Sequence, residues 1–246
     1  MQQKSKVMDK LRIKDGVGYF ADGLTVISHK YYDEYELSSF VIPGSVQVID
    51  KAAFYYCTAL SSIVIPDSVR KIGRCAFADC YSLSTIDLSN SLIEIEEEAF
   101  RNCYGIEKIT LPKSLTHLGF YAFCNCRELK KVKLSSSMTK IELGTFEGCS
   151  SLSSIVIPNS VVEIEECAFQ NCTSLQSVTL GTRIKIIDKD VFKGCDMLKS
   201  IIVPKGKAES YRMILPEQYH HLIQTKPTKR NKIDHSVLYI NFNDCL

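Results

Sequence analysis

The sequence predicts a repeat solenoid, a chain wound into stacked coils of equal length. Three apolar columns carry this prediction, because each returns every 23 residues along most of the 246-residue chain. A fixed period of this size is typical of stacked repeats that bury a continuous core between neighbouring units. The first column is Leu37, Leu60, Leu83, Ile106, Leu129, Leu152, Leu175 and Leu198; the second is Phe54, Phe77, Phe100, Phe123, Phe146, Phe169 and Phe192; the third is Cys57, Cys80, Cys103, Cys126, Cys149, Cys172 and Cys195.

Residues 1–36 are predicted to form an N-terminal, hairpin-containing cap. Asp15-Gly16 and Asp22-Gly23 are turn signals, and the runs between them alternate in the manner of short strands. A solenoid exposes an apolar cross-section at each end, so a cap over the first coil is physically required.

Residues 37–204 hold seven full copies of the 23-residue unit and the start of an eighth. Each copy opens with a strand, such as residues 60–65, and Pro66 or its counterpart ends that strand. A turn carrying an Ala-Phe pair follows, and residues that tolerate a left-handed backbone, such as Asn102, end it. We therefore expect a right-handed superhelix with a parallel β ladder on one face and short helical or 3-10 turns on the other.

One small polar residue recurs at the corner after six of the strands, and the seventh repeat has Arg183 in its place, so that corner is expected to be more open. Such a side chain can satisfy backbone groups exposed at a buried corner. The serines in this position are Ser45, Ser68, Ser91, Ser114, Ser137 and Ser160.

Residues 205–246 are predicted to form a C-terminal helical cap and a tail. Residues 208–215 have helical spacing, Pro216 interrupts it, and residues 219–223 continue the amphipathic pattern. Residues 226–234 read as a polar, basic linker. The run 236–242 has the composition of a strand, so self-association through residues 236–246 is one hypothesis for the tail.

Composition and charge narrow the function classes. The chain has 30 basic and 28 acidic residues and a net charge of +2, a balance that predicts neither specific nucleic-acid binding nor a membrane surface. No apolar run reaches the length of a membrane span. The first residues lead into no apolar segment of a secretory signal, which favours the cytoplasm if the sequence is complete.

The eleven cysteines predict reduced, structural thiols, because their number is odd and seven belong to the repeat. A repeated buried thiol is expected to fill a repeated gap as a small hydrophobe. Cys75, Cys124 and Cys167 fall outside that register and are expected nearer the surface. Cys124-x-Cys126 lacks a second ligand pair, so neither a metal nor a cofactor is predicted.

No catalytic constellation emerges from the other polar residues. The five histidines fall in no nucleophile or zinc motif, and His220-His221 is interpreted as a solvated surface pair. The acidic cluster of residues 94–98 is interpreted as a solvated turn.

The strand template Leu-x-x-Ile-x-Ile resembles the leucine-rich repeat. The whole unit, as in residues 153–161 followed by Ile164, Ala168-Phe169 and Cys172, is similar to the BspA-like subfamily. Serine replaces the usual Asn or Cys ladder residue, and the next apolar position comes one residue early, as in that variant. The resemblance covers roughly residues 37–204 and implies a protein-binding or adhesion role, often at a microbial surface. It also implies a cell-surface or secreted location if a signal was removed.

The outward strand positions are the candidate binding face, because packing fixes their inward neighbours. In the middle coils this face gathers Lys108, Lys131 and Lys133, a cationic patch suited to an acidic protein surface or an anionic polymer. The alternative is that these lysines merely solubilise a broad sheet face. The whole candidate face is Val64, Asp87, Lys108, Thr110, Lys113, Lys131, Lys133 and Val156.

The sequence therefore favours a non-enzymatic scaffold that recognises a macromolecule through the outward strand face. A structural or self-associating protein is the first alternative. A hydrolase with its site in the caps is the remote one.

Overall fold

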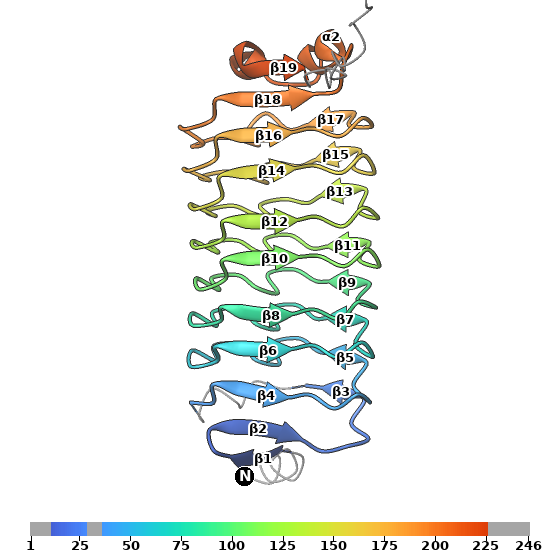
Figure 1. Ribbon diagram of the computed structural model, residues 1–246, viewed down its shortest axis with the longest axis vertical. Helices are drawn as coiled ribbons and strands as arrows, with labels where there is room; N and C mark the ends of the chain where they lie inside the picture. The colour runs from blue at the N-terminus through green and yellow to red at the C-terminus, as the bar shows by residue number, and fades with distance from the viewer. Residues whose placement is uncertain (1–10, 29–35, 226–246) are drawn as a thin grey trace, which may run out of the picture.

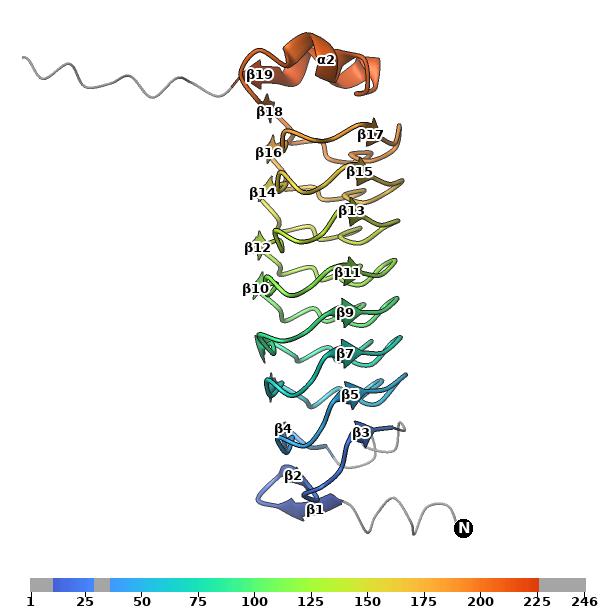
Figure 2. The same cartoon turned by 90° about the vertical axis from the view of Figure 1, so that its right-hand side faces the viewer.

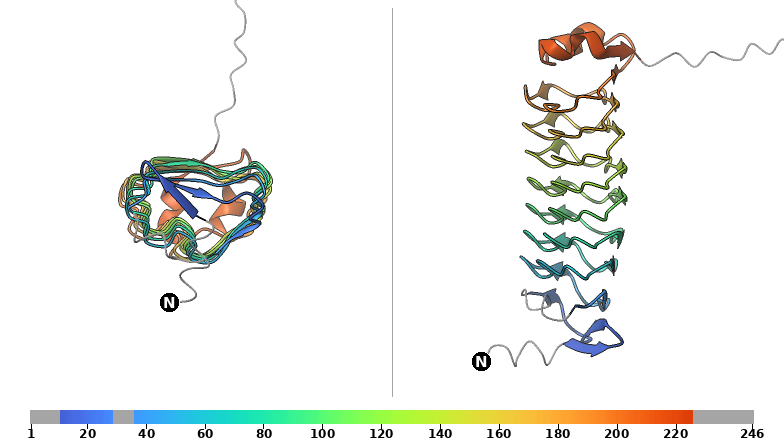
Figure 3. Two further views of the ribbon diagram at one scale, coloured as in Figure 1. Left: turned by 90° about the horizontal axis from the view of Figure 1, so that it is seen from below. Right: turned by 90° about the vertical axis from the view of Figure 1, so that its left-hand side faces the viewer.

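The computed structural model describes residues 11–28 and 36–225. The chain climbs in one column of stacked coils, with the first and last elements at opposite ends (Figure 1). Seen along the column, the coils superimpose on one closed outline (Figure 3). The predicted leucine-rich-repeat solenoid is confirmed.

The longer strand of each coil forms a parallel ladder up one side of the column. Each residue pairs with its counterpart in the next coil, as Ile63 does with Ile86. The pairing is interrupted between β8 and β10 and between β12 and β14. The strands are β2 (Val17–Phe20), β4 (Ser39–Val41), β6 (Ser62–Val64), β8 (Thr85–Asp87), β10 (Lys108–Thr110), β12 (Lys131–Lys133), β14 (Ser154–Val156), β16 (Ser177–Thr179) and β18 (Ser200–Val203).

A second parallel ladder of two-residue strands runs beside the first (Figure 2). The sequence did not reveal it, because two residues are too few to show an alternating pattern. This ladder is interrupted between β11 and β13, where the first ladder is intact, so every step between coils keeps at least one paired ladder. Its strands are β3 (Val26–Ile27), β5 (Val48–Ile49), β7 (Lys71–Ile72), β9 (Glu94–Ile95), β11 (His117–Leu118), β13 (Lys140–Ile141), β15 (Glu163–Ile164) and β17 (Ile186–Ile187).

The third side of each coil consists of tight turns that do not join into a helix. The Cys80 amide donates to the Phe77 carbonyl three residues back, which is the hydrogen bond of a 3-10 turn. Residues with positive φ interrupt the turns, and these were predicted in part. Asn102 (φ 59°) and Asn171 (φ 58°) have the expected left-handed backbone. A second left-handed position, occupied by residues such as Glu98 (φ 56°), was missed because its side chains have no common type.

This turn side forms a third hydrogen-bonded ladder between coils. The amide of Cys75 donates to the carbonyl of Glu97 at 3.0 Å, and the amide of Phe77 donates to that of Ala99 at 2.8 Å. Equivalent bonds recur from Ala52 onward through the repeats. Since buried amides and carbonyls must find partners, the ladder fixes the path of a segment that has no regular secondary structure.

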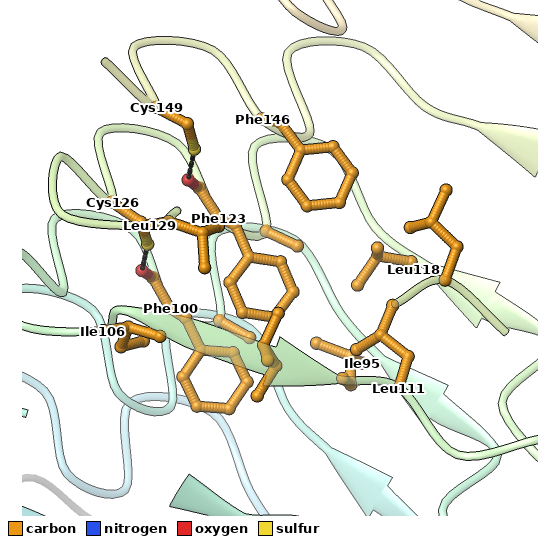
Figure 4. Packing of buried hydrophobic residues seen from close by; sticks show 14 of the residues in the cluster. Ile95, Phe100, Ile106, Leu111, Leu118, Phe123, Cys126, Leu129, Phe146 and Cys149 are labelled. Atoms are coloured by element: carbon orange, nitrogen blue, oxygen red, sulfur yellow. Dashed lines mark hydrogen bonds between the residues drawn. The ribbon is translucent and has the colours of Figure 1, made fainter. Parts of the chain in front are cut away.

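The phenylalanine column forms a continuous stack inside the solenoid (Figure 4). Phe77 and Phe100 lie 5.2 Å apart between ring centroids with nearly parallel planes, and Phe100 and Phe123 repeat that distance. These rings are fully buried. Offset stacking adds to the stabilisation from buried area, so each coil depends on its two neighbours.

The cysteine column combines packing with a repeated hydrogen bond. The Cys126 thiol lies 3.3 Å from the Phe100 carbonyl, and the Cys149 thiol lies 3.2 Å from the Phe123 carbonyl (Figure 4). A thiol is a weak donor, but here it supplies a second partner to a buried carbonyl of the preceding coil. The expectation that these thiols pack as small apolar groups is therefore extended by a polar role.

The corner serines follow expectation only in part. Ser45 Oγ donates to the Leu24 carbonyl at 2.8 Å, and Ser114 Oγ donates to carbonyls of the preceding coil. The expectation is wrong for Ser68 and Ser160, whose buried hydroxyls have no hydrogen-bond partner within the described ranges. At those corners serine acts as a small residue.

The N-terminal end of the column is a hairpin. β1 (Leu11–Lys14) pairs antiparallel with β2 through the Asp15-Gly16 turn, whose φ angles of 52° and 73° suit the tight two-residue connection. β2 then pairs parallel with β4. Phe20 packs edge-on against Phe54 at 6.0 Å, which covers the first ring of the buried stack.

The C-terminal end is closed by α2 (Ala208–Arg212), the 3-10 helix η2 (Glu217–Leu222) and β19 (Ile223–Thr225), which pairs with β18. Tyr211 is buried and donates its hydroxyl to the Gly181 carbonyl. Tyr219 meets Phe192 edge-on at 5.6 Å and ends the aromatic stack. The linker and strand expected at residues 226–246 lie outside the described residues.

Replacing Phe123 by alanine is expected to lower the free energy of unfolding by about 3–5 kcal/mol, because it leaves a cavity between two stacked rings. Phe123→Leu keeps most of the volume and is expected to cost about 1–2 kcal/mol. Urea titrations followed by circular dichroism measure both. An alanine variant with the wild-type midpoint would contradict the stacked core.

The buried thiols are expected to resist alkylation in the folded protein. Burial raises the pKa of Cys126 well above its usual value, and it also raises the pKa of Cys75 and Cys167, which lie partly exposed. Brief treatment with iodoacetamide at pH 8, mapped by mass spectrometry, should modify Cys75 and Cys167 slowly and Cys126 only after urea is added. Equal labelling of Cys126 and Cys75 in the native state would be inconsistent with this packing.

Candidate functional site

The candidate binding face lies on the outward side of the long strands. Lys108 pairs in register with Lys131, and Thr110 pairs with Lys133, so the three lysines occupy two adjacent strands. All four side chains are exposed, while the residue between them on each strand points into the core. Lys113, at the corner after β10, is exposed as well.

The other members of the candidate face flank these strands. Val64 pairs in register with Asp87 on the N-terminal side, and Val156 lies on β14 beyond the lysines. Both valines are 62% exposed. The structure therefore presents every candidate residue on the outward side, in the order in which the coils are stacked.

The lysines at the centre of this face are not neutralised. Within the described residues, no ion pair joins Lys108, Lys131 or Lys133 to a carboxylate, whereas the nearby Lys130 pairs with Glu107 at 3.0 Å. Like charges in register on neighbouring strands disfavour each other. Among the residues that the structure describes, the geometry thus holds three cations without a carboxylate partner, on strands about 4.8 Å apart.

A row of aromatic side chains borders this face and was missed from the sequence. Tyr81 and Tyr104 stack at 5.1 Å, Tyr56 meets Tyr81 edge-on at 5.8 Å, and the Arg127 guanidinium lies 4.8 Å above the Tyr104 ring. Tyr81 and Tyr104 each follow a cysteine of the repeat by one position, and this recurrence was the available signal. The Tyr81 and Tyr104 rings cover each other, whereas Tyr56 is 47% exposed.

The outward side of the short strands carries a different pattern, in which charges are paired between coils. Lys71 contacts both Glu94, at 3.2 Å, and Glu96. The Glu96 carboxylate also accepts a hydrogen bond from the backbone amide of Arg74 at 2.9 Å. The hydrogen bond from the Lys71 ammonium to Glu96 raises the pKa of Lys71. The interpretation of residues 94–98 as a merely solvated turn is wrong, since these half-buried carboxylates link neighbouring coils.

A second network lies higher on the same side. Lys140 contacts Glu142 at 3.5 Å, Glu163 at 3.7 Å and Glu165. Burial and a hydrogen bond with Glu165 raise the pKa of Glu142 to about 7. Burial acts to raise the pKa of Glu165 too, but hydrogen bonds from Lys140, Glu142 and the Leu143 amide outweigh it and lower that pKa. The two carboxyl groups therefore share a proton near neutral pH.

Beside the first of these networks the surface is hollowed. The hollow has a volume of about 270 Å³ and lies over Gly119, where a side chain would collide with the Glu97 backbone. Phe120 stands at its edge, 44% exposed. The lining residues are Arg74, Glu94, Glu96, Glu97, His117, Gly119 and Phe120.

Two expectations about cysteine and histidine need correction. Cys75 and Cys167 are partly exposed as expected, but Cys124 is buried, and burial raises its pKa to about 12. The His220 ring donates from Nε2 to the Leu215 carbonyl at 2.9 Å, so it is part of the cap rather than a solvated neighbour of His221.

Within residues 11–28 and 36–225, no group of three or more His, Cys, Asp or Glu side chains is placed to hold a metal ion. Nor does that part of the chain contain a helix with the length and apolar character needed to cross a membrane.

Comparisons with known proteins support the fold. The sequence model of a family described as "BspA type Leucine rich repeat region" matches residues 25–150 and 93–214, with six copies. A comparison with curated proteins gave no match.

One solved structure supports the same fold. The crystal structure of a leucine-rich repeat protein from T. pallidum is similar over 88% of this chain and 94% of its own, with 25% identity and a TM-score of 0.53. A leucine-rich cell surface protein from Faecalibacterium prausnitzii A2-165 is more distant, with 19% identity over 83% of this chain and 95% of its own and a TM-score of 0.43.

The shared proton of Glu142 and Glu165 predicts a dependence of stability on pH. Because the pKa of Glu142 is higher in the folded chain than in the unfolded chain, proton binding at Glu142 stabilises the fold. This contribution is fully present below the ordinary pKa of 4.5 and is lost as pH rises through about 7. Glu142→Gln retains a donor toward Glu165 at every pH. This variant should therefore match the wild type at pH 5 and exceed its free energy of unfolding by about 1 kcal/mol at pH 8, a difference limited by solvent screening.

Urea titrations at the two pH values measure this difference. Parallel pH profiles of the Glu142→Gln variant and the wild type would refute the shared proton.

Proposed function

Because this chain belongs to the BspA-type leucine-rich repeat family, we propose that it is a recognition scaffold that binds an acidic surface of a partner protein. The proposed contact is the outward side of β8, β10, β12 and their neighbours. The observation that carries the proposal is the set of three exposed lysines, Lys108, Lys131 and Lys133, that no carboxylate neutralises within the described residues.

The surroundings of the lysines fit a protein partner. Thr110 adds a hydroxyl group between the charges, and Asp87 adds a negative charge at one end. Val64 and Val156 provide exposed apolar contacts on either side. Protein interfaces combine apolar contacts with charges that steer the partner. Lys113 extends the positive charge toward the corner. The mixture favours an acidic polypeptide over an anionic polysaccharide, which has no apolar side chains to contact the valines.

The proposed role is non-enzymatic. Proteins of this repeat family are generally binding scaffolds, and adhesion is one form of such binding. The inward positions and the turn side are occupied by packing and by backbone hydrogen bonds. Recognition through the outward strand positions requires binding contacts alone and no catalytic group.

Changing Lys108, Lys131 and Lys133 together to glutamate should abolish binding to an acidic probe without unfolding the protein. Fluorescently labelled poly-L-glutamate is a suitable probe, and binding should weaken as salt rises because exposed charges are screened. Fluorescence anisotropy measures affinity, and thermal melts confirm the fold.

The matched control changes Lys185, Lys189 and Lys193 to glutamate. These exposed lysines lie away from the proposed contact, and the change in net charge is the same. The control should bind the probe with near wild-type affinity. Equal binding by the Lys108 triple variant and the wild type would reject this face, whereas binding to heparin but not to poly-L-glutamate would reject a protein partner.

A further inference from the structure

The outward residues of the short strands form a self-complementary series. In stacking order the column is Val26, Val48, Lys71, Glu94, His117, Lys140, Glu163 and Ile186, and the seven members from Val48 to Ile186 form the self-complementary part. Reversed about His117, the series places Lys71 opposite Glu163 and Glu94 opposite Lys140. It also places Val48 opposite Ile186, both apolar, while Val26 lies beyond the contact with no counterpart.

We infer that the short-strand face binds a second copy of this chain in a two-fold symmetric dimer centred near His117. A two-fold axis parallel to the short strands reverses the order of the coils and keeps the strand direction. The column of one copy then meets the same column of its partner. A contact of this kind uses one surface twice and closes on itself.

Charge complementarity carries the argument. Within one copy, Lys71 lies 3.2 Å from Glu94, and Lys140 lies 3.7 Å from Glu163. In the dimer the Lys71–Glu94 pair of one copy faces the Glu163–Lys140 pair of the other. The four charges then stand at the corners of a square, with opposite signs next to each other. Every charge then has neighbours of opposite sign in its own copy and in the other.

Apolar contacts lie where the axis requires them. Phe120 belongs to the same coil as His117, is 44% exposed and stands beside the hollow over Gly119. Around the axis, this exposed ring of each copy faces the hollowed surface of the other. At the far end of the column, Ile186 is 54% exposed and lies opposite Val48 of the second copy.

The long-strand face lacks this complementarity. An equivalent axis at Lys108 and Thr110 would place Lys108 opposite Lys108 of the second copy. Lys131 and Lys133 of the two copies, which no described carboxylate pairs, would then flank this contact. The short-strand face is the one on which a second copy fits, so this inference is separate from the partner contact proposed above.

The expected affinity is modest. Seven coils at about 4.8 Å give a strip of about 30 Å in length, and because its strands are two residues long the contact is at the small end for stable interfaces. The adjoining column opposes acid to acid at two places, Glu96 to Glu142 and Asp50 to Asp188. We therefore expect a dissociation constant in the micromolar range.

Sedimentation velocity of the full chain from 5 to 500 µM, at about 0.1 M salt, tests the inference. The wild type should shift from monomer to dimer. Two charge variants, Lys71→Glu/Lys140→Glu and Glu94→Lys/Glu163→Lys, should each raise the dissociation constant at least tenfold, while their equimolar mixture should associate. A wild type that stays monomeric at 500 µM, or variants that dimerise like the wild type, would overturn it.

Two further variants keep the outcome decisive. Phe120→Asp removes an exposed apolar side chain and leaves every ion pair between coils intact, so it should weaken the dimer without disturbing the fold. Circular dichroism of each variant checks that it is folded. The Lys108/Lys131/Lys133→Glu variant should dimerise normally. Loss of probe binding with an intact dimer, or the reverse, separates the two proposals.

Discussion

The stacking of each coil on the next is the constraint on which the structure depends. No coil buries its own apolar surface, and three hydrogen-bonded ladders, two of strands and one of turns, join it to its neighbours. The phenylalanine stack fills the space that these ladders enclose, and Phe20 and Tyr219 cover its two ends. Because the same contacts repeat at every step, the repeat leaves little freedom at inward and turn positions.

That constraint sorts side chains into those required for folding and those available for binding. The cysteines, which look most reactive in the sequence, donate to buried carbonyls such as that of Phe100. The two outward strand faces remain, and they differ in kind. The long-strand face holds exposed lysines such as Lys131 that no carboxylate of the described chain pairs, whereas the short-strand face pairs its charges between coils, as Lys71 does with Glu94.

Much of the fold could be predicted from the sequence, because the 23-residue period marks every inward residue. The outward lysines followed from the same alternation. Other features were hidden for physical reasons. The short strands have one inward residue each, such as Ile72, so no alternation shows. Left-handed Glu98 carries no residue-type signal, and the burial of Cys124 depends on how adjacent turns meet. The paired carboxylates of Glu142 and Glu165 lie on different coils.

The central claim is that packing leaves the long-strand face free for recognition. Reductive methylation of lysines, with and without saturating poly-L-glutamate and read by mass spectrometry, tests it most directly. If this face binds the probe, Lys108, Lys131 and Lys133 should be strongly protected, and the labelling of Lys185 and Lys189 should be unchanged. Uniform protection of all lysines, or protection that excludes the first three, would contradict it.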